Sequence, residues 1–438
     1  MRQKEHVSKT HKPKQTTGQE ENLTVALREE KHVIATWPEF RDSLAGLSVD
    51  IGSTTVAAQL SNLGSGEIMS EAGMMNPQIR YGEDVMSRVS FIMLNPGGEK
   101  LLTNAIRSAI EDLASECAKI AKIKRQDIVE LTVVGNPIMH HIFLGLDVVP
   151  LGQAPFPLAK DGPYTCLASA LNLDINPGAH VHILPCIAGH VGADTAAVIL
   201  SEAPQASDVV TLIVDIGTNA EIVLGNRRRL LACSSPTGPA FEGAQISCGQ
   251  RAAAGAIERV RVDHVTLEPR FKVIGSDLWS DDLNYLASVE NIGVTGICGS
   301  GIIEALAELF LCGTITADGL FNPDKAELNS RIEKDGKTYR YLLHAGPPAI
   351  HITQIDIRNI QLAKGAVYAG ARLLMDKLAV DYVDRIVLTG AFGSYIDPKY
   401  AMVLGLIPDC SLSAVSAAGN AAGTGARIAL LDLSLIHI

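Results

Sequence analysis

The chain has 438 residues, of which 47% are hydrophobic, 19% charged and 5% aromatic, and its formal net charge is −11. This length predicts two or three domains, or one large bilobed unit, with enough apolar residues for complete cores. The negative charge and a single basic cluster, at Arg227–Arg229, argue against nucleic-acid binding. Every apolar stretch is shorter than the ~18 residues that a membrane-spanning helix needs, so we expect no membrane partner.

The N-terminal segment is polar. Residues Met1–Asn22 lack the apolar centre of a secretory signal, so we expect a cytoplasmic protein. Residues 1–45 are predicted to be a flexible tail or linker, because polar residues without periodicity dominate their first part. The eight cysteines of the chain form no Cys-x-x-Cys pair, which predicts neither a disulfide framework nor an iron–sulfur cluster.

Beyond this tail, strand-like and helical patterns of apolar residues follow one another along the chain, which predicts an α/β fold. The pattern indicates a β-hairpin at 47–60, a helix over 99–121 and a buried strand over 131–134. Further helices are predicted over 190–200, 301–312, 360–378 and 421–431, and further strands over 209–215, 221–224 and 385–388.

One segment of the sequence occurs twice. Leu47-Ser-Val-Asp-Ile-Gly-Ser-Thr-Thr55 is echoed by Leu212-Ile-Val-Asp-Ile-Gly-Thr-Asn-Ala220, and the two aspartates, Asp50 and Asp215, are 165 positions apart. This spacing is far longer than the ~20–50 residues of a solenoid repeat, so the echo predicts a duplicated domain. We therefore predict a first lobe over residues 46–205 and a second lobe over residues 206–432.

Each copy is an apolar strand that ends in aspartate and continues into a turn rich in hydrogen-bond donors. Glycine in such a turn lets the backbone approach a ligand, and hydroxyl and amide groups can bind an anion. These residues are Gly52, Ser53, Thr54 and Thr55 in the first copy and Gly217, Thr218 and Asn219 in the second.

Asp50 and Asp215 would repel a phosphate directly, but they can hold water on a Mg²⁺ ion that neutralises the phosphate. A single copy would more often be an ordinary turn. Two copies at the spacing of a domain instead predict a pair of loops that clamp one metal-bound nucleotide.

A third element is the buried strand that runs into a glycine-rich turn at Arg385–Gly393. Gly390 and Gly393, with Ala391 and Phe392 between them, would let a flat ring lie close to the backbone. Taken alone, these residues are equally typical of a plain turn from a strand to a helix.

The order of these three elements resembles the phosphate and adenosine motifs of the ASKHA superfamily, which contains acetate and sugar kinases, heat-shock chaperones and actin. The chain is more closely similar to the ATPase part of the reductive activators of corrinoid proteins. That similarity spans about residues 47–432 and is carried by Asn76–Val85, Gly135–His141, Gly238–Gly243 and Gly419–Ala426.

The resemblance implies a duplicated ribonuclease-H-like, actin-like ATPase fold that uses ATP and Mg²⁺. It implies that Asp50 and Asp215 position the metal through water and that Asp194 orients the attacking water. It also implies that the helices at 190–200 and 418–431 connect the lobes. ATP binding or hydrolysis would then drive the reductive reactivation of a corrinoid cofactor on a partner protein.

Two departures from the family pattern concern the ends of the chain. Members usually carry an N-terminal plant-type ferredoxin module with a [2Fe-2S] cluster, whereas no cysteine precedes Gly46. We therefore expect the electron donor on a missing segment or on another chain. Members also continue well past the second connecting helix, whereas this sequence stops at Ile438. Residues 433–438 can be encoded by a transposon-end adapter used in sequencing libraries, so we expect a sequencing artefact and a natural chain that was cut near Asp432.

Three other functions stay open: a small-molecule kinase for an acid or a sugar, an actin-like scaffold, and an activator of a radical dehydratase. A homodimer is open as well. We interpret His140 and His141 as structural and Cys298 as a packed thiol. Phe241 and Glu242 could equally face the nucleotide or close the lobe.

Overall fold

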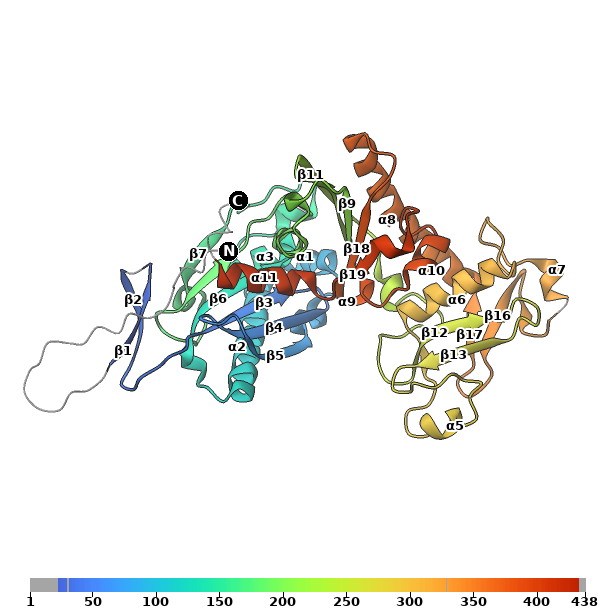
Figure 1. The fold of residues 1–438 in the computed structure, drawn as a ribbon, viewed down its shortest axis with the longest axis horizontal. Helices are drawn as coiled ribbons and strands as arrows, with labels where there is room; N and C mark the ends of the chain where they lie inside the picture. Colours follow the sequence, from blue (N-terminus) through green and yellow to red (C-terminus); the bar gives the residue numbers. More distant parts are fainter. Residues whose placement is uncertain (1–22, 30, 328, 433–438) are drawn as a thin grey trace, which may run out of the picture. The chain divides into compact units, whose positions relative to one another are not determined.

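The structure is a computed structural model that describes residues 23–29, 31–327 and 329–432. Contacts within the chain divide it into two units. Unit 1 holds the described residues up to Ala203 together with Ala421–Asp432, and unit 2 holds Pro204–Asn420. Each unit contains a mixed sheet and helices (Figure 1), so the predicted α/β class is confirmed.

The sheet of unit 1 has the strand order β5-β4-β3-β6-β8-β7. Strand β4 runs antiparallel to β3 and β5, whereas β3, β6 and β8 are parallel to one another. The strands are β3 (Ala45–Ile51), β4 (Thr55–Asn62), β5 (Ile68–Met75), β6 (Ile128–Gly135), β7 (Tyr164–Leu167) and β8 (His180–Ile183).

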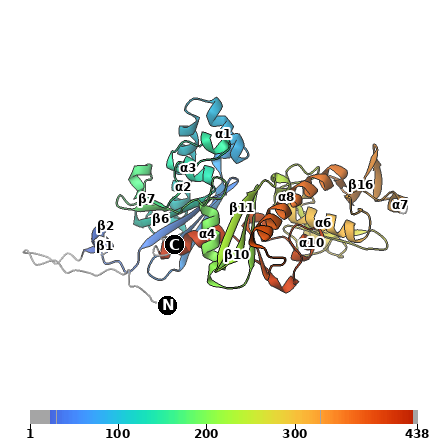
Figure 2. The same cartoon turned by 90° about the horizontal axis from the view of Figure 1, so that it is seen from above.

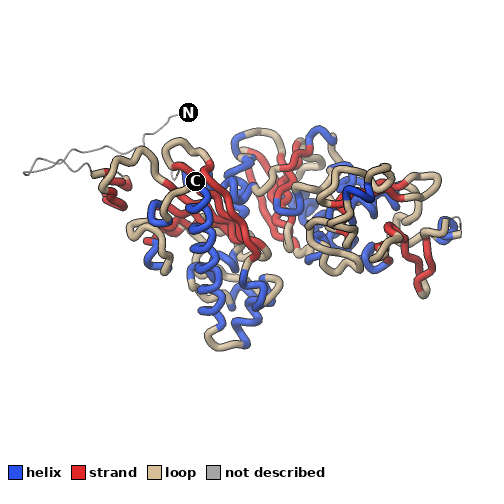
Figure 3. The backbone as a smooth tube through the Cα atoms, turned by 90° about the horizontal axis from the view of Figure 1, so that it is seen from below, coloured by secondary structure: helices blue, strands red, loops and turns tan. Residues whose placement is uncertain are grey.

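The main sheet of unit 2 repeats this topology, with the order β11-β10-β9-β18-β19. In both sheets the first four strands along the chain lie in the order third, second, first, fourth, the second of them is antiparallel to its neighbours, and a later parallel strand, β8 or β19, lies beside the fourth. In unit 1 the antiparallel strand β7 extends the sheet beyond β8. The strands of the unit 2 sheet are β9 (Thr211–Ile216), β10 (Ala220–Asn226), β11 (Arg229–Ser235), β18 (Arg385–Thr389) and β19 (Val415–Ala417). The duplicated two-sheet architecture that the sequence echo predicted is therefore confirmed (Figure 3).

Helices cover both faces of the sheet in unit 1 (Figure 2). Helix α2 (Gly98–Ala121) packs on β4 and β5 with an apolar face that includes Leu102, Ile106 and Ile110, as its 3.6-residue periodicity predicted. Helix α4 (Ala193–Glu202) and helix α11 (Ala421–Leu431) pack against each other, and α11 also contacts β3 and β6. The remaining helices of this unit are α1 (Val85–Leu94) and α3 (Pro137–Leu144).

The position of α11 corrects the predicted lobe boundaries. We assigned residues up to 432 to the second lobe, whereas α11 belongs to unit 1. The reason is close packing between small residues, because Gly425 of α11 lies so near the Ala197 carbonyl of α4 that no side chain would fit. Leu430 of the same helix reaches Gly46 of β3. The break between the units after Ala203 is close to the boundary predicted at residue 205.

The predicted tail over residues 1–45 is wrong for its second part. Strands β1 (Thr24–Arg28) and β2 (His32–Trp37) form an antiparallel hairpin. Trp37 packs on Val129 of β6, and its indole Nε1 donates a hydrogen bond of 2.9 Å to Asp127. These two strands carry enough apolar residues to pack on unit 1, a signal that the polar residues before them obscured. Our predictions for residues 1–22 and 433–438 lie outside the described residues.

In unit 2, helix α8 (Gln354–Leu378) packs on β10 and β11, and it begins six residues earlier than its sequence pattern indicated. Helix α6 (Gly299–Leu311) packs on β12 (Ala256–Val262). Two small sheets complete the unit, with β12 between β13 (Pro269–Val273) and β14 (Gly296–Ile297), and β16 (Thr338–His344) between β15 (Ile332–Asp335) and β17 (Ile350–Thr353). Short helices are α5 (Tyr285–Ser288), α7 (Pro323–Ala326), α9 (Gly390–Gly393) and α10 (Pro398–Val403).

Across the described ranges, no helix is both long enough and apolar enough to cross a lipid bilayer.

Candidate functional site

In unit 1, the first acidic hairpin lies at the carboxyl end of two parallel strands. Asp50 is half-buried near the end of β3, opposite Val134 of β6 in the parallel register. The turn that follows, Gly52–Thr54, is called loop 1 here, and it leads directly into β4. Its residues are half-exposed and Thr55 is exposed, so the turn borders solvent at an edge where α/β sheets bind ligands.

The backbone of loop 1 is held from one side by buried polar side chains. Asn76 donates through Nδ2 to the Gly52 carbonyl (2.8 Å), and its backbone N–H donates to the Thr54 carbonyl (2.9 Å). The guanidinium of Arg88 donates to the Ser53 carbonyl. Both Asn76 and Arg88 are fully buried. Three consecutive carbonyl groups therefore point toward the protein interior.

This arrangement fixes the direction of the amide groups as well. In a planar trans peptide, a carbonyl and the N–H of the next residue point in opposite directions. The N–H groups of Ser53, Thr54 and Thr55 are therefore directed away from the side chains that bind the preceding carbonyls. Successive N–H groups turned outward form a concave donor set that fits a phosphate.

Asp194 reaches the same strand edge from another element of unit 1. It lies in the first turn of α4, and a Cβ on the preceding Gly192 would lie 2.6 Å from the Gly135 oxygen and the Asn136 Cα. Since Gly135 is the last residue of β6 and pairs with Ile51 of β3, the start of α4 and loop 1 border the same edge. The structure thus brings Asp50 and Asp194 to one edge within unit 1.

The carboxyl group of Asp194 has an unusual protonation equilibrium. Its Oδ1 accepts hydrogen bonds from the Thr195 N–H (2.7 Å) and hydroxyl (3.4 Å). Burial outweighs these bonds and raises its pKa to about 6. Burial and the Asp194 carboxylate raise the pKa of the neighbouring Cys186 to about 12, so this thiol stays protonated. Asp194 is therefore suited to accept a proton near neutral pH.

In unit 2, the second acidic hairpin is held in the same manner as the first. Asp215 lies near the end of β9, and the turn Gly217–Asn219, called loop 2, leads into β10. The hydroxyl of Thr237 donates to the carbonyls of Gly217 (3.3 Å) and Thr218 (3.0 Å). By the peptide geometry used for loop 1, the N–H groups of Thr218 and Asn219 point away from Thr237.

A carboxylate also supports loop 2. The Thr218 hydroxyl donates to Glu242 Oε1 at 2.6 Å. Glu242 is half-buried, whereas the preceding Phe241 is fully buried and its ring stacks on Phe392 at 5.6 Å. We left open whether Phe241 and Glu242 face the nucleotide or close the lobe. In the structure, Phe241 packs in the core of unit 2, and Glu242 accepts the hydrogen bond from Thr218 of loop 2.

The glycine-rich turn Gly390–Gly393 lies beside Asp215 in unit 2. Strands β18 and β9 are parallel with Thr389 opposite Asp215, so the turn and the aspartate border the same edge. Gly390 has φ +92°, and a Cβ there would overlap the Asp215 carboxylate. The structure thus brings together Asp215, loop 2 and this turn within unit 2.

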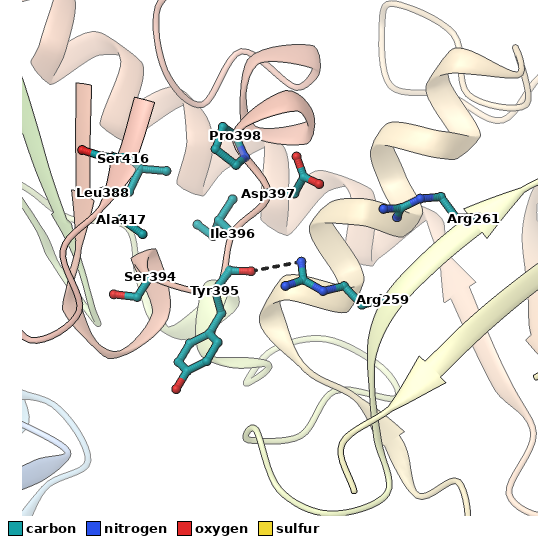
Figure 4. A pocket seen from close by; sticks show the side chains of 10 residues that line it. All are labelled: Arg259, Arg261, Leu388, Ser394, Tyr395, Ile396, Asp397, Pro398, Ser416 and Ala417. Carbon is teal, nitrogen blue, oxygen red and sulfur yellow. Dashed lines mark hydrogen bonds between the residues drawn. The ribbon is translucent and has the colours of Figure 1, made fainter. Parts of the chain in front are cut away.

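A cavity of about 340 Å³ adjoins this turn through Ser394 (Figure 4). Arg259 of β12 donates to the Tyr395 carbonyl (3.4 Å) and to Glu304 of α6 (2.8 Å). Arg261 also pairs with the buried Glu304. Since both guanidinium groups pair with the one carboxylate of Glu304 and a second carboxylate, Asp397, also lines the cavity, it suits a polar group without a high negative charge. The other lining residues are Leu388, Ile396, Asp397, Pro398, Ser416 and Ala417.

The remaining candidate residues are accounted for by packing. His141 is buried, and its Nε2 accepts hydrogen bonds from the Ala159 and Lys160 N–H groups (3.1 and 3.3 Å). Burial lowers the pKa of both His140 and His141, to about 4 for His140. Cys298 is 2% exposed and its thiol donates to the Ile257 carbonyl. Within the described ranges, no three His, Cys, Asp or Glu side chains gather as a metal site.

Comparison with known proteins connects this geometry to a family. Residues 45–205 match the model of the RACo middle region, and residues 209–437 match that of the C-terminal domain of RACo, the ASKHA domain. The chain belongs to the RACo family. The predicted resemblance to reductive activators of corrinoid proteins is therefore confirmed, and with it the actin-like fold.

The chain spans about two thirds of the length of the relatives that it matches. It is 36% identical to the corrinoid activation enzyme RamQ of Eubacterium limosum, over 88% of this chain and 64% of the relative. It is 26% identical to the [Co(II) methylated amine-specific corrinoid protein] reductase of Methanosarcina barkeri, over 89% and 70%. The solved structure of a reductive activator for corrinoid, iron-sulfur protein matches with a TM-score of 0.79 and 32% identity, over 95% of this chain and 66% of the other.

Proposed function

We propose that this chain is the ATPase part of an enzyme that couples ATP to the reductive reactivation of a corrinoid protein in the cytoplasm. Its membership of the RACo family and its similarity to proteins named for corrinoid activation support this function. One observation carries the proposal. In both units, an acidic strand end precedes a loop whose carbonyls are held inward and whose N–H groups point outward.

The donor set of these loops suits a magnesium nucleotide. Asp50 and Asp215 would hold Mg²⁺ through water, and the bound ion would neutralise phosphate charge. The outward N–H groups at Ser53–Thr55 and Thr218–Asn219 would bind the phosphates. The turn Gly390–Gly393 would lie against the flat base, because its backbone has no bulky side chain at Gly390 and Gly393.

Asp194 is the proposed group that orients the attacking water. Its position in the first turn of α4, at the same edge as loop 1, supports this role. With a pKa of about 6, it is mostly ionised at pH 7.5 and can accept a hydrogen bond and then a proton from water.

Electrons for the corrinoid would come from a separate donor, a [2Fe-2S] module on another segment or another chain. Reduction of the corrinoid cobalt is thermodynamically unfavourable with ordinary electron donors, so ATP would supply the free energy that the reduction requires. A conformational change on ATP binding or hydrolysis would supply the coupling.

The decisive experiment measures ATP turnover with and without an oxidised corrinoid protein. We compare wild type, Asp215→Ala and the control Asp208→Ala, an exposed acid of unit 2 that pairs with Arg227. We expect Asp215→Ala to lose about 100-fold in turnover and the control to match wild type. Equal turnover in all three proteins would reject the site. A corrinoid protein that neither binds nor stimulates wild type would leave a generic ATPase and reject the proposed use.

A further inference from the structure

We infer that Arg88 is a positioning residue for the polyphosphate, because its buried guanidinium both orients loop 1 and places a positive charge behind it. The inference rests on the proposed nucleotide site and adds a residue that neither the acidic hairpins nor the glycine-rich turn contains. Arg88 belongs to α1, and its side chain is among the largest fully buried ones in the chain.

Neutral groups surround the guanidinium of Arg88. Its Nε donates to the Gly82 carbonyl (3.0 Å), and its Nη1 donates to Gln78 Oε1 (3.2 Å) and lies 3.2 Å from Met139 Sδ. Its Nη2 donates to the Ser53 carbonyl of loop 1. In the described part of unit 1, no carboxylate forms an ion pair with Arg88.

A charge in such surroundings is unfavourable for the fold. Burial lowers the pKa of Arg88 to about 10, so the group is still protonated at neutral pH. The charge of Asp84, whose carboxylate caps α1 through the Ser87 N–H, partly opposes this lowering of the Arg88 pKa. Burying a cation without a contacting anion is costly, so proteins keep one where a nearby anion or a functional need compensates.

The bonds of Arg88 connect this charge to the loop geometry. Gln78 is itself fixed, since its Nε2 donates to the Leu102 carbonyl (2.9 Å) and its N–H donates to Asn76 Oδ1 (3.0 Å). Asn76, Gln78 and Arg88 thus form one buried network behind loop 1. Within it, Asn76 supplies geometry without charge, whereas Arg88 supplies both.

A polyphosphate bound to the outward N–H groups of loop 1 would lie across one peptide layer from the guanidinium. At such a separation and an intermediate dielectric, one unit charge changes the affinity for an anion by a factor of about 10. The effect should increase with the charge of the nucleotide. A role confined to the stability of unit 1 as a whole would instead weaken Mg-ATP, Mg-ADP and adenosine to the same extent.

The experiment compares the binding of Mg-ATP, Mg-ADP and adenosine by calorimetry. For Arg88→Gln we expect about tenfold weaker ATP binding, a smaller loss for ADP and adenosine affinity within twofold of wild type. Arg88→Lys retains the charge and should recover most of the ATP affinity. Arg107→Gln is the matched control, a half-buried arginine of the same unit that donates to the Phe143 carbonyl (2.9 Å) and should leave all three affinities unchanged.

The outcomes separate this inference from the proposed function. Wild type that fails to bind Mg-ATP would overturn both. If wild type binds Mg-ATP, two results for Arg88→Gln would overturn the role of Arg88 alone. These are an unchanged ATP affinity and an equal loss of affinity for all three ligands. If Arg88→Gln does not fold, Arg88→Lys decides, because loss of the wild-type preference for ATP over ADP in that charge-retaining variant would contradict the inference.

Discussion

Gly390 lies directly against the carboxylate of Asp215, so close that a methyl group on Gly390 would overlap Oδ1. Gly390 also has φ +92°, a backbone conformation that costs residues other than glycine about 1 kcal/mol or more. The side-chain conformation of Asp215, our proposed metal-positioning group, thus depends on the absence of a side chain at Gly390, which directly follows β18.

The first prediction concerns this contact. Gly390→Ala should displace the Asp215 carboxylate and lower ATP turnover by about 100-fold, because a misplaced charged group loses most of its effect. Gly365→Ala is the control, since a Cβ on this helical glycine of α8 meets no atom within 4 Å. It should stabilise the fold by about 1 kcal/mol without changing turnover. A Gly390→Ala enzyme with full activity would show that the position of Asp215 does not matter.

The second prediction is a pH profile. An ordinary aspartate is ionised throughout pH 5–8, whereas Asp194 has a pKa of about 6. Proton acceptance requires the ionised form, so turnover should be low at pH 5, rise with a midpoint near pH 6 and level off above pH 7. Asp194→Asn should be about 100-fold slower and show no such step. The same midpoint in Asp194→Asn would assign the titration to another group.

The third prediction tests the support of loop 2. Glu242→Ala removes the acceptor of the Thr218 hydroxyl and should raise the KM for ATP about fivefold, because the loop must then be ordered by the nucleotide. Glu242→Gln keeps an oxygen acceptor and should remain within twofold of wild type. Steady-state kinetics at saturating Mg²⁺ make this comparison. Equal KM values for alanine and wild type would remove Glu242 from the site.

The fourth prediction concerns the N-terminal hairpin. Arg28 pairs with Glu130 of β6 at 3.0 Å, and burial raises the pKa of Glu130 to about 7 despite this cation. In Arg28→Ala the pKa of Glu130 should rise further. Above that pKa the buried carboxylate is ionised without a partner, which lowers the free energy of unfolding of the variant, whereas at low pH Glu130 is neutral and the loss is small. We expect the thermal midpoint to fall by about 5 °C at pH 8.5 and by about 1 °C at pH 6.

The control for this pair is the same substitution in a neutral background. When Glu130 is already glutamine, Arg28→Ala should lower the midpoint equally at both pH values, because no carboxylate remains to titrate. A pH-dependent difference in that background would show that groups other than Glu130 cause it.

Much of the fold follows from local patterns in the sequence. The apolar periodicity of residues 99–121 predicts α2 to within one residue, and the repeated Asp-Ile-Gly segment predicts two hairpins and two similar sheets. These predictions succeed because each depends on residues that are neighbours along the chain, where amphipathic spacing and turn chemistry decide the structure.

The elements that the sequence did not reveal depend on contacts between distant segments. The hairpin β1–β2 is ordered by Trp37 and Arg28 against β6, about 100 positions away, and its own strands are short and follow a long polar segment. Arg88 follows an acidic, polar stretch and would be read as a surface residue, yet the packing of α1 buries it. Asn76 begins one of the family motifs and Thr237 directly precedes another, but only the folded structure shows that their side chains hold loops 1 and 2.

Because α11 is part of unit 1 although it follows unit 2 in the sequence, the two units cannot finish folding in the order in which they are translated. Unit 2 is one continuous stretch, Pro204–Asn420, and can fold as soon as that stretch has emerged. Unit 1 is made first but must wait for Ala421–Leu431, the helix that covers β3, β6 and α4, until translation has passed the whole of unit 2. During this interval the uncovered apolar face of the nascent first unit is exposed, and chaperones that bind such faces would find it there.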